Sequence, residues 1–272
     1  MNVPGIGLVV IGDEILGGKR ADKHLPRVIE LLGARGLALD WAHVVGDERA
    51  RITALLQQVF ASGDIVFCCG GIGATPDDHT RQSAAAALQR PLRLHPGARR
   101  LIEERMQDMA REQGLPFEPG RADNLQRLQM GVFPQGAALI ANPYNKIPGF
   151  SIGDVHFVPG FPVMAHPMIE SLLDGRYAPL HGRSAQRERS VIVHDGMEAA
   201  LTPLMEQLEA AHAGVKVFSL PSVDHPVLGR HIELGVKGRG AEVDAAYAEL
   251  KRGLDRLGAR LGTEMVRGAG SA

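Results

Sequence analysis

The residues best suited to chemistry lie in the stretch GGIGATPDDHT, which spans residues 70–80. Three glycines in this stretch permit positive φ angles, so that successive backbone N–H groups can point at an anion. They are Gly70, Gly71 and Gly73. Two carboxylates, Asp77 and Asp78, follow at once. This combination favours a site for a ligand that carries a phosphate group.

Capping of a helix is the alternative explanation for the same residues. Thr75 and Asp78 have the spacing of a capping box, with Thr75 as the N-cap and Pro76 in the first turn. Thr80 is a second candidate for the N-cap. A cap needs one acid and no run of glycines, so the sequence alone leaves both explanations open.

Two further acidic motifs, both reading GDE, occur at residues 12–14 and 46–48. Asp47 either caps the helix that follows it or faces the glycine loop across a cleft. Carboxylates placed in this way could hold a hard divalent ion such as Mg²⁺ through oxygen ligands. The candidate metal ligands are Asp13, Glu14, Asp47 and Asp78. Such an ion would balance the charge between these acids and an anionic ligand.

The elements that must position these residues alternate along the first 90 residues. Apolar runs at 7–11, 37–45 and 64–69 are typical of buried strands, and amphipathic helices separate them. This alternation predicts a three-layer α/β/α domain with a mainly parallel sheet. Ligands of such sheets bind beyond the carboxyl ends of the strands, and all three motifs follow a strand. We therefore expect them to line one cleft.

The remaining sequence predicts helices between residues 96 and 130, a strand at 137–141 and a hairpin whose turn is Gly153-Asp154. Residues 174–190 are polar and lack periodicity, which favours a domain boundary. The patterns beyond it predict a small α+β domain built as strand, helix, two strands and helix. We therefore expect an α/β domain over residues 1–175 and a small α+β domain over residues 190–265.

Composition excludes several classes of protein. The 272 residues carry a formal net charge of −1, which does not favour nucleic acid or an anionic membrane as a partner. The two cysteines, Cys68 and Cys69, are adjacent, which fits neither a disulfide framework nor a zinc site. The first residues have no basic segment and no apolar run long enough for a bilayer. We expect a cytoplasmic protein without a membrane segment.

The glycine–aspartate stretch resembles the G-G-x-G-x-T-x-D-D-x-T loop of the molybdopterin-binding (MoaB/MogA-like) superfamily of molybdenum cofactor (MoCF) biosynthesis, particularly its competence/damage-inducible protein A (CinA) branch. GDEILGGK and VVGDERARI resemble the first two strand-end motifs of that branch. NPYNKIPGF and FVPGFPVM resemble two later segments, with Asn145 in place of a usual glycine and Met164 where an acid is usual. The resemblance covers about residues 5–175. The carboxyl-terminal amidohydrolase domain of full CinA proteins has no counterpart in this sequence.

The resemblance implies a set of site residues. It matches Asp47 and Asp78 to the acids implicated in catalysis. The implied ligand-binding residues are Gly70, Gly71, Gly73, Thr75, Asp77, Thr80, Asn142, Pro148 and Gly149.

The resemblance also implies a function, which is to bind a pterin such as molybdopterin, or a nucleotide, through its phosphate. The alternative is a metal-dependent pyrophosphatase that hydrolyses ADP-ribose- or FAD-like nucleotides. A module without catalysis, acting through oligomerisation, is a third hypothesis, and the complete set of acids argues against it. A homo-oligomer, either a dimer or a trimer, is expected from the resemblance alone.

Overall fold

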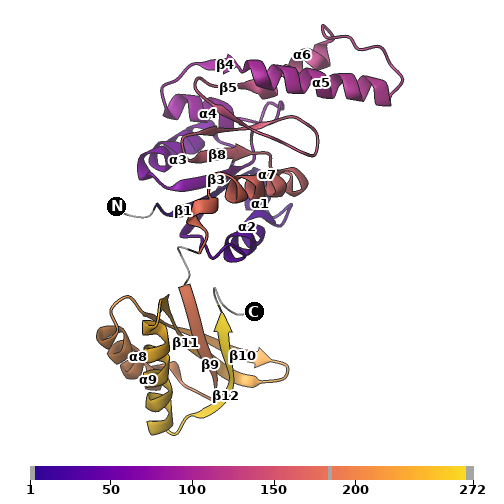
Figure 1. The fold of residues 1–272 in the computed structure, drawn as a ribbon. Helices are drawn as coiled ribbons and strands as arrows, with labels where there is room; N and C mark the ends of the chain where they lie inside the picture. The colour runs from indigo at the N-terminus through magenta and orange to yellow at the C-terminus, as the bar shows by residue number, and fades with distance from the viewer. Residues whose placement is uncertain (1–3, 183–185, 268–272) are drawn as a thin grey trace. The chain divides into compact units, whose positions relative to one another are not determined.

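The computed structural model describes residues 4–182 and 186–267 and is drawn in Figure 1. The chain divides into two compact units. The first comprises Ala38–Pro179 together with the segment that ends at Leu32, and the second comprises Gly33–Leu37 together with the segment from Leu180 onward. No helix within the described ranges is both long enough and apolar enough to cross a membrane.

The first unit is built on a six-stranded sheet of order β2-β1-β3-β8-β7-β6. Its parallel strands are β2 (Trp41–Val45), β1 (Ile6–Ile11), β3 (Ile65–Cys69) and β8 (Val155–Val158). Strand β7 (Gly149–Ile152) pairs antiparallel with β8, and β6 (Ala138–Ile140) pairs antiparallel with β7. Every residue of β1 and β3 is buried, as expected of strands covered on both faces. The prediction of a mainly parallel sheet is confirmed.

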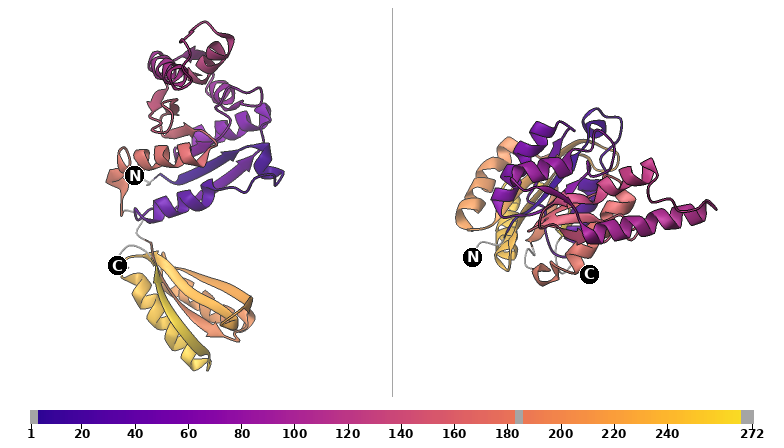
Figure 2. Two further views of the ribbon diagram at one scale, coloured as in Figure 1. Left: turned by 90° about the vertical axis from the view of Figure 1, so that its right-hand side faces the viewer. Right: turned by 90° about the horizontal axis from the view of Figure 1, so that it is seen from above.

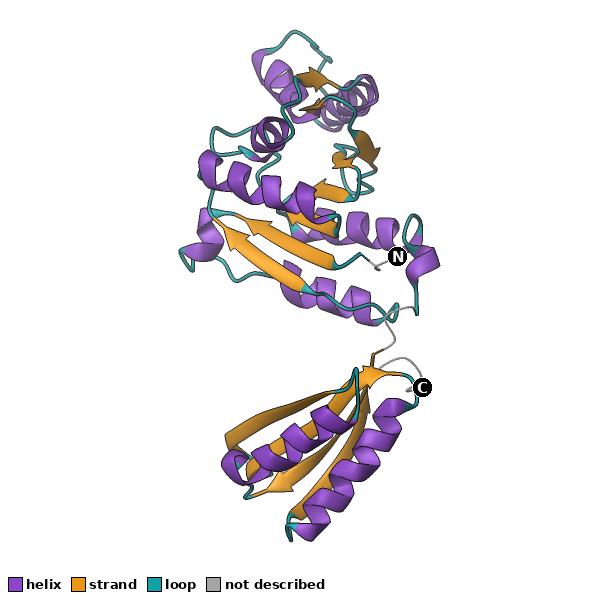
Figure 3. Cartoon of the chain, turned by 90° about the vertical axis from the view of Figure 1, so that its left-hand side faces the viewer, coloured by secondary structure: helices purple, strands orange, loops and turns teal. Residues whose placement is uncertain are grey.

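Helices cover both faces of this sheet, which gives the three predicted layers (Figure 3). On one face, α3 (Arg49–Ser62) and α4 (Thr80–Ala87) pack against alternate strand residues, among them Val9 and Val66. Leu8 and Val10 point the opposite way because successive strand residues alternate between faces. That second face is covered by α2 (His24–Gly33) and α7 (Pro162–Asp174), whose His24 and His166 rings are in contact.

Beyond α4 the chain forms a small outlying layer. It contains β4 (Leu92–Leu94), α5 (Pro96–Glu112), α6 (Ala122–Leu128), the 3-10 turn η1 (Gln129–Gly131) and β5 (Val132–Pro134). The helices match the expectation for residues 96–130, and Figure 2 shows α5 projecting away from the main sheet. The pairing of β4 with β5 was not expected, because three residues are too few to show a strand period. The hairpin between β7 and β8 turns at Gly153-Asp154, as predicted.

The second unit contains β9 (Gln186–His194), α8 (Glu198–Ala211), β10 (Lys216–His225), β11 (Gly229–Arg239), α9 (Glu242–Arg256) and β12 (Arg260–Arg267). The sheet is antiparallel, with order β10-β11-β9-β12, which is the ferredoxin-like arrangement. Both helices pack on one face of it. The sequence did not predict β12, because its pairing with β9 is irregular between Leu261 and Glu264 and breaks the alternation.

The polar stretch at residues 174–190 is partly structured. The short η2 turn (Ala178–Leu180) lies within it, and β9 already begins at Gln186. Arg187 and Arg189 therefore belong to a strand, where both donate hydrogen bonds to Asp244. Residues 183–185 of the expected boundary lie outside the described residues.

Candidate functional site

The three sequence motifs meet at one edge of the main sheet. β1 pairs in parallel with both β2 and β3, so the segments that follow these strands leave the sheet at the same edge. A cavity of about 460 Å³ lies there. Its lining comes from all three strand ends and from residues 142–148 and 159–164.

The first glycines of the loop are required by close packing. Gly70 and Gly71 have φ angles of 112° and 67°, which favour glycine. A Cβ atom on Gly70 would lie 2.2 Å from the carbonyl oxygen of Ile11, and one on Gly71 would lie 2.2 Å from Oγ1 of Thr80. The Thr80 hydroxyl is buried beneath the loop and donates to the Gly70 carbonyl at 3.0 Å. Thr80 therefore supports the loop and does not line the cavity.

Asp78 binds the loop that precedes it. Its two carboxylate oxygens accept the N–H groups of Gly73 at 2.9 Å and Thr75 at 2.8 Å, and the Thr75 hydroxyl also donates to it. Helix α4 begins only at Thr80, with His79 in the N-cap position. The prediction that Thr75 caps this helix is wrong, because a turn closed by the Asp78 N–H and the Thr75 carbonyl lies between them.

The loop also contains N–H groups that no described residue accepts. Among the described residues, those of Gly71, Ile72 and Ala74 have no hydrogen-bond acceptor. All three residues line the cavity, as do the predicted residues Gly70, Gly73, Thr75, Asp77 and Asp78. Consecutive free N–H groups in a loop with positive φ angles form a concave site that favours an anion.

Asp47 lines the same cavity as this loop. Its Oδ2 accepts the Asp13 N–H at 2.9 Å, while its own N–H donates to Asp13 Oδ1 at 3.2 Å. Helix α3 begins at Arg49 with Glu48 in the N-cap position and no side-chain cap, so the prediction that Asp47 is that cap is wrong. Burial, together with the charges of nearby acids that include Glu14, raises the pKa of Asp47, although the Asp13 N–H opposes the shift.

The four acids proposed as metal ligands do not form a preformed metal site. Within the part of the chain that the structure describes, no group of three or more His, Cys, Asp or Glu side chains is placed to hold a metal. Glu14, Asp47 and Asp78 line the cavity but Asp13 does not, and both oxygens of Asp78 already accept hydrogen bonds. These residues do not fit a Mg²⁺ cage made by the protein alone, which would need octahedral oxygen ligation.

Another part of the cavity wall comes from the NPYNKIPGF segment. The Asn142 side chain is buried and donates to Asn145 Oδ1 and to the Ile147 carbonyl, at 2.8 and 2.9 Å. Asn142 and Pro148 both line the cavity, whereas Gly149 does not. A Cβ on Gly149 would lie 2.4 Å from the carbonyl oxygen of Phe157. The close pairing of β7 with β8 therefore accounts for a glycine at this predicted ligand-binding position.

Several lining residues were not predicted as site residues. Phe161 lies shortly after β8, lines the cavity and is 56% exposed. The other motifs were found by examining the segment after each parallel strand. The same search after β8 would have found Phe161. Arg20 brings a cation to an otherwise acidic lining. Met130 comes from η1, distant in sequence from every motif, and no local signal marks it.

The sequence is similar to one family model and to several known proteins. Residues 7–179 match the model of a family described as a probable molybdopterin binding domain. A CinA-like protein of Anaeromyxobacter sp. (strain Fw109-5) is 29% identical over 248 residues, which covers 89% of this chain and 57% of that protein. The chain therefore spans little more than half the length of this relative. A protein of Pyrobaculum calidifontis (strain DSM 21063 / JCM 11548 / VA1) is 28% identical over 91% of this chain and 95% of its own length.

Among solved structures, the protein CinA from Thermoplasma acidophilum superposes with a TM-score of 0.52 and 23% identity. The superposition covers 62% of this chain and 97% of that chain. A likeness at this level of identity supports a common fold for that part of the chain and says nothing of the ligand.

Proposed function

This chain belongs to the family of probable molybdopterin binding domains, and from that membership we propose that its cleft binds a pterin or nucleotide through a phosphate group. The observation that carries the proposal is the set of N–H groups without an acceptor at Gly71, Ile72 and Ala74. Backbone N–H groups of this kind bind phosphate oxygens without a dedicated basic side chain.

The rest of the cleft suits the ring system of such a ligand. Exposed Phe161 offers an aromatic face beside Met164 and Ile147, and flat heterocycles stack on surfaces of this kind. The carboxylates of Glu14 and Asp47 would repel a phosphate. A divalent cation bound mainly by the ligand's own phosphate oxygens would offset that repulsion, which is the usual way in which Mg²⁺ enters nucleotide sites.

Calorimetric titration tests the proposal with matched pairs of compounds. We expect FMN to bind more tightly than riboflavin, and AMP more tightly than adenosine, each by about tenfold to a hundredfold, because hydrogen bonds to a charged group contribute about 1.5–3 kcal/mol. Each titration is repeated with and without Mg²⁺. Phe161→Ala should weaken both members of a pair equally, because it removes ring contacts only. Equal affinity for the phosphorylated and unphosphorylated members would contradict the proposal.

A second candidate is hydrolysis of the diphosphate bond of ADP-ribose or FAD. The observation that favours it is Asp47, a carboxylate in the cleft whose pKa is raised, with burial as the largest cause. A raised pKa makes a carboxylate a better general base for a water molecule. The test is release of AMP from either compound with Mg²⁺, Mn²⁺ or Co²⁺. Asp47→Asn should lower the rate at least about a hundredfold, and absence of AMP with all three metals would count against hydrolysis.

A further inference from the structure

Arg81 is a buried cation without a carboxylate partner. Only 4% of the residue is exposed, and none of its nitrogen atoms forms an ion pair with any residue in 4–182 or 186–267. One terminal nitrogen donates to the Gly73 carbonyl, but Nε–H has no acceptor. A buried charge that lacks both a counter-ion and a full set of hydrogen bonds is strongly disfavoured, and proteins normally pair it.

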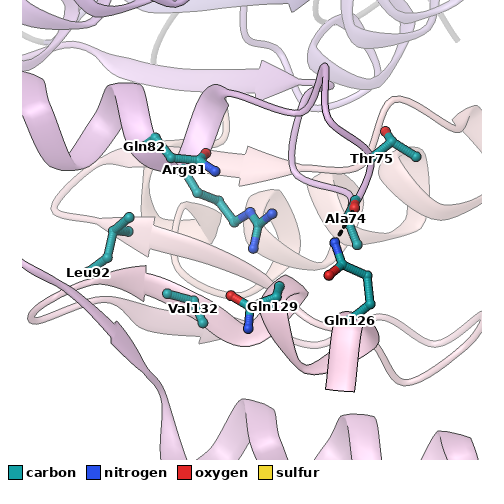
Figure 4. A pocket seen from close by; sticks show the side chains of 8 residues that line it. All are labelled: Ala74, Thr75, Arg81, Gln82, Leu92, Gln126, Gln129 and Val132. Carbon is teal, nitrogen blue, oxygen red and sulfur yellow. Dashed lines mark hydrogen bonds between the residues drawn. The ribbon is translucent and has the colours of Figure 1, made fainter. Parts of the chain in front are cut away.

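The guanidinium group of Arg81 lines a second cavity, of about 310 Å³. In Figure 4 its guanidinium points into the space that the amides of Gln126 and Gln129 also face, and Leu92 and Val132 supply an apolar wall. This cavity shares only Ala74 and Thr75 with the cleft described above.

The fold fixes Arg81 in this position without a direct ion pair. Arg81 follows Thr80, whose N–H donates to the Gly71 carbonyl at 3.0 Å and anchors the first turn of α4. Asp78 is the acid whose field acts on Arg81, but its oxygens bind Gly73 and Thr75 instead. Arginine keeps its proton in proteins, so a positive charge faces the cavity at neutral pH.

We propose that this second cavity is a binding site for a small oxyanion, either a phosphate group or a carboxylate, held by Arg81. The planar fork of a guanidinium matches both groups and binds them with paired hydrogen bonds. The amide of Gln129 offers further donors, and the apolar wall accommodates the body of an organic anion. The inference does not depend on what the cleft binds.

The resonance of the Arg81 Nε–H group in a ¹⁵N-labelled full chain tests the proposal directly. Its assignment comes from its loss in Arg81→Lys, or from backbone-linked spectra if that variant does not fold. Inorganic phosphate and acetate are titrated separately against sodium chloride at equal ionic strength. We expect a saturable shift with at least one of the two anions, and their relative affinities identify the preferred group. The amide resonances of Gly71 and Ile72 report on the cleft in the same spectra.

Gln129→Glu is the decisive variant, because it keeps the shape of the side chain and adds a carboxylate to the cavity. We expect this carboxylate to pair with Arg81, shift its resonance before any anion is added and weaken phosphate or acetate binding at least tenfold. Gln107→Glu makes the same charge change on an exposed position of α5 and should leave binding unchanged. An Arg81 resonance that responds to neither anion, or a Gln129→Glu variant that binds as the wild type does, would overturn the proposal and leave Arg81 as a support for Gly73 alone.

Discussion

Among single residues, Asp78 has the largest influence on the shape of the glycine loop. It accepts two backbone N–H groups and one hydroxyl from that loop. A carboxylate can accept at both oxygens, whereas the amide of asparagine has one oxygen and presents N–H to the other donor. The residue that the family resemblance implicates in catalysis is thus also the residue that holds Gly73 and Thr75 in place.

We therefore expect Asp78→Asn to loosen the loop, at a cost of about 1–3 kcal/mol for the donor left unpaired. Hydrogen exchange at the Gly73 and Thr75 amides should accelerate, and the midpoint of thermal unfolding should fall. Asp77→Asn is the matched control, because it removes the same charge from an exposed neighbour that does not bind Gly73. Equal exchange rates in the two variants would show that Asp78 does not organise the loop.

The carboxyl group of Asp47 should also affect how the stability of the fold depends on pH. The pKa of its carboxyl is raised in the folded state, chiefly by burial, so the folded protein binds this proton more tightly than the unfolded chain does. The resulting contribution to stability is full below the ordinary pKa of 3.8 and is lost as pH rises through the higher folded value.

Removing this titration should change how stability depends on pH. We measure the free energy of unfolding of Asp47→Asn and of the wild type with urea between pH 3.5 and pH 7. The value for the variant minus the value for the wild type should increase as pH rises. A difference between the two proteins that stays constant over this range would contradict the raised pKa of Asp47.

At the scale of elements, a buried network fastens the β7–β8 hairpin to the segment after α7. Ser151 Oγ lies 2.7 Å from His156 Nδ1, His156 Nε2 lies 2.6 Å from the Tyr177 hydroxyl, and that hydroxyl donates to Asp154 at 2.7 Å. Because the single proton of Tyr177 goes to Asp154, His156 donates through Nε2 and accepts from Ser151 through Nδ1. Both ring nitrogens are therefore satisfied in the neutral imidazole.

This network should make the first unit sensitive to mild acid. Burial, aided by the charge of Arg176, lowers the pKa of His156 from 6.5 to about 4. As pH falls, His156 is protonated in the unfolded chain before it is protonated in the folded protein. Its contribution to the free energy of unfolding is therefore complete above pH 6.5 and declines by roughly 3 kcal/mol as pH falls towards 4. Urea unfolding across this range should show the decline in the wild type and in His43→Gln, which changes an exposed histidine. In His156→Gln the decline should be smaller, with a remainder from His166, whose pKa is also lowered by burial. An equal decline in that variant would contradict the assignment.

The sequence predicted the elements around the site better than the contacts within it. A strand buried on both faces appears as an apolar run, and parallel strands end at one edge, so the placement of Asp13, Asp47 and the glycine loop followed from pattern alone. The partners of Asp78 could not be predicted, because they depend on the φ and ψ angles of five loop residues at once. The close contact of Gly149 with Phe157 could not be predicted for a similar reason, since it exists only after the hairpin has formed.

At the scale of the whole molecule, each unit has a hydrophobic core of its own. The core of the second unit joins Val191, Leu234, Tyr247 and Leu250 with residues of α8, all from positions beyond residue 190. We expect residues 180–267 produced alone to unfold in one cooperative transition and to give dispersed amide spectra. Cleavage of the full chain between Gly175 and Arg189 should yield two protease-resistant fragments, and a fragment without cooperative unfolding would refute independent folding.

The predicted homo-oligomer also belongs to this scale and stays a prediction. Sedimentation equilibrium at micromolar concentration should give a mass of two or three times the 29.2 kDa of one chain. A monomer under these conditions would contradict it.

The way in which the glycine loop is held has a consequence for the speed and the entropy of binding. Thr80 supports Gly70, Asp78 and Arg81 hold Gly73, and the Gln126 amide donates to the Ala74 carbonyl at 2.8 Å. These residues therefore lose their conformational entropy when the protein folds and not when a ligand binds. Because the loop already has one main conformation, a ligand does not have to wait for a rare conformer. The association rate should then be limited by diffusion and by removal of water from the ligand and the site. Changes in the supporting residues would then slow capture and make its entropy less favourable without removing a single contact to the ligand.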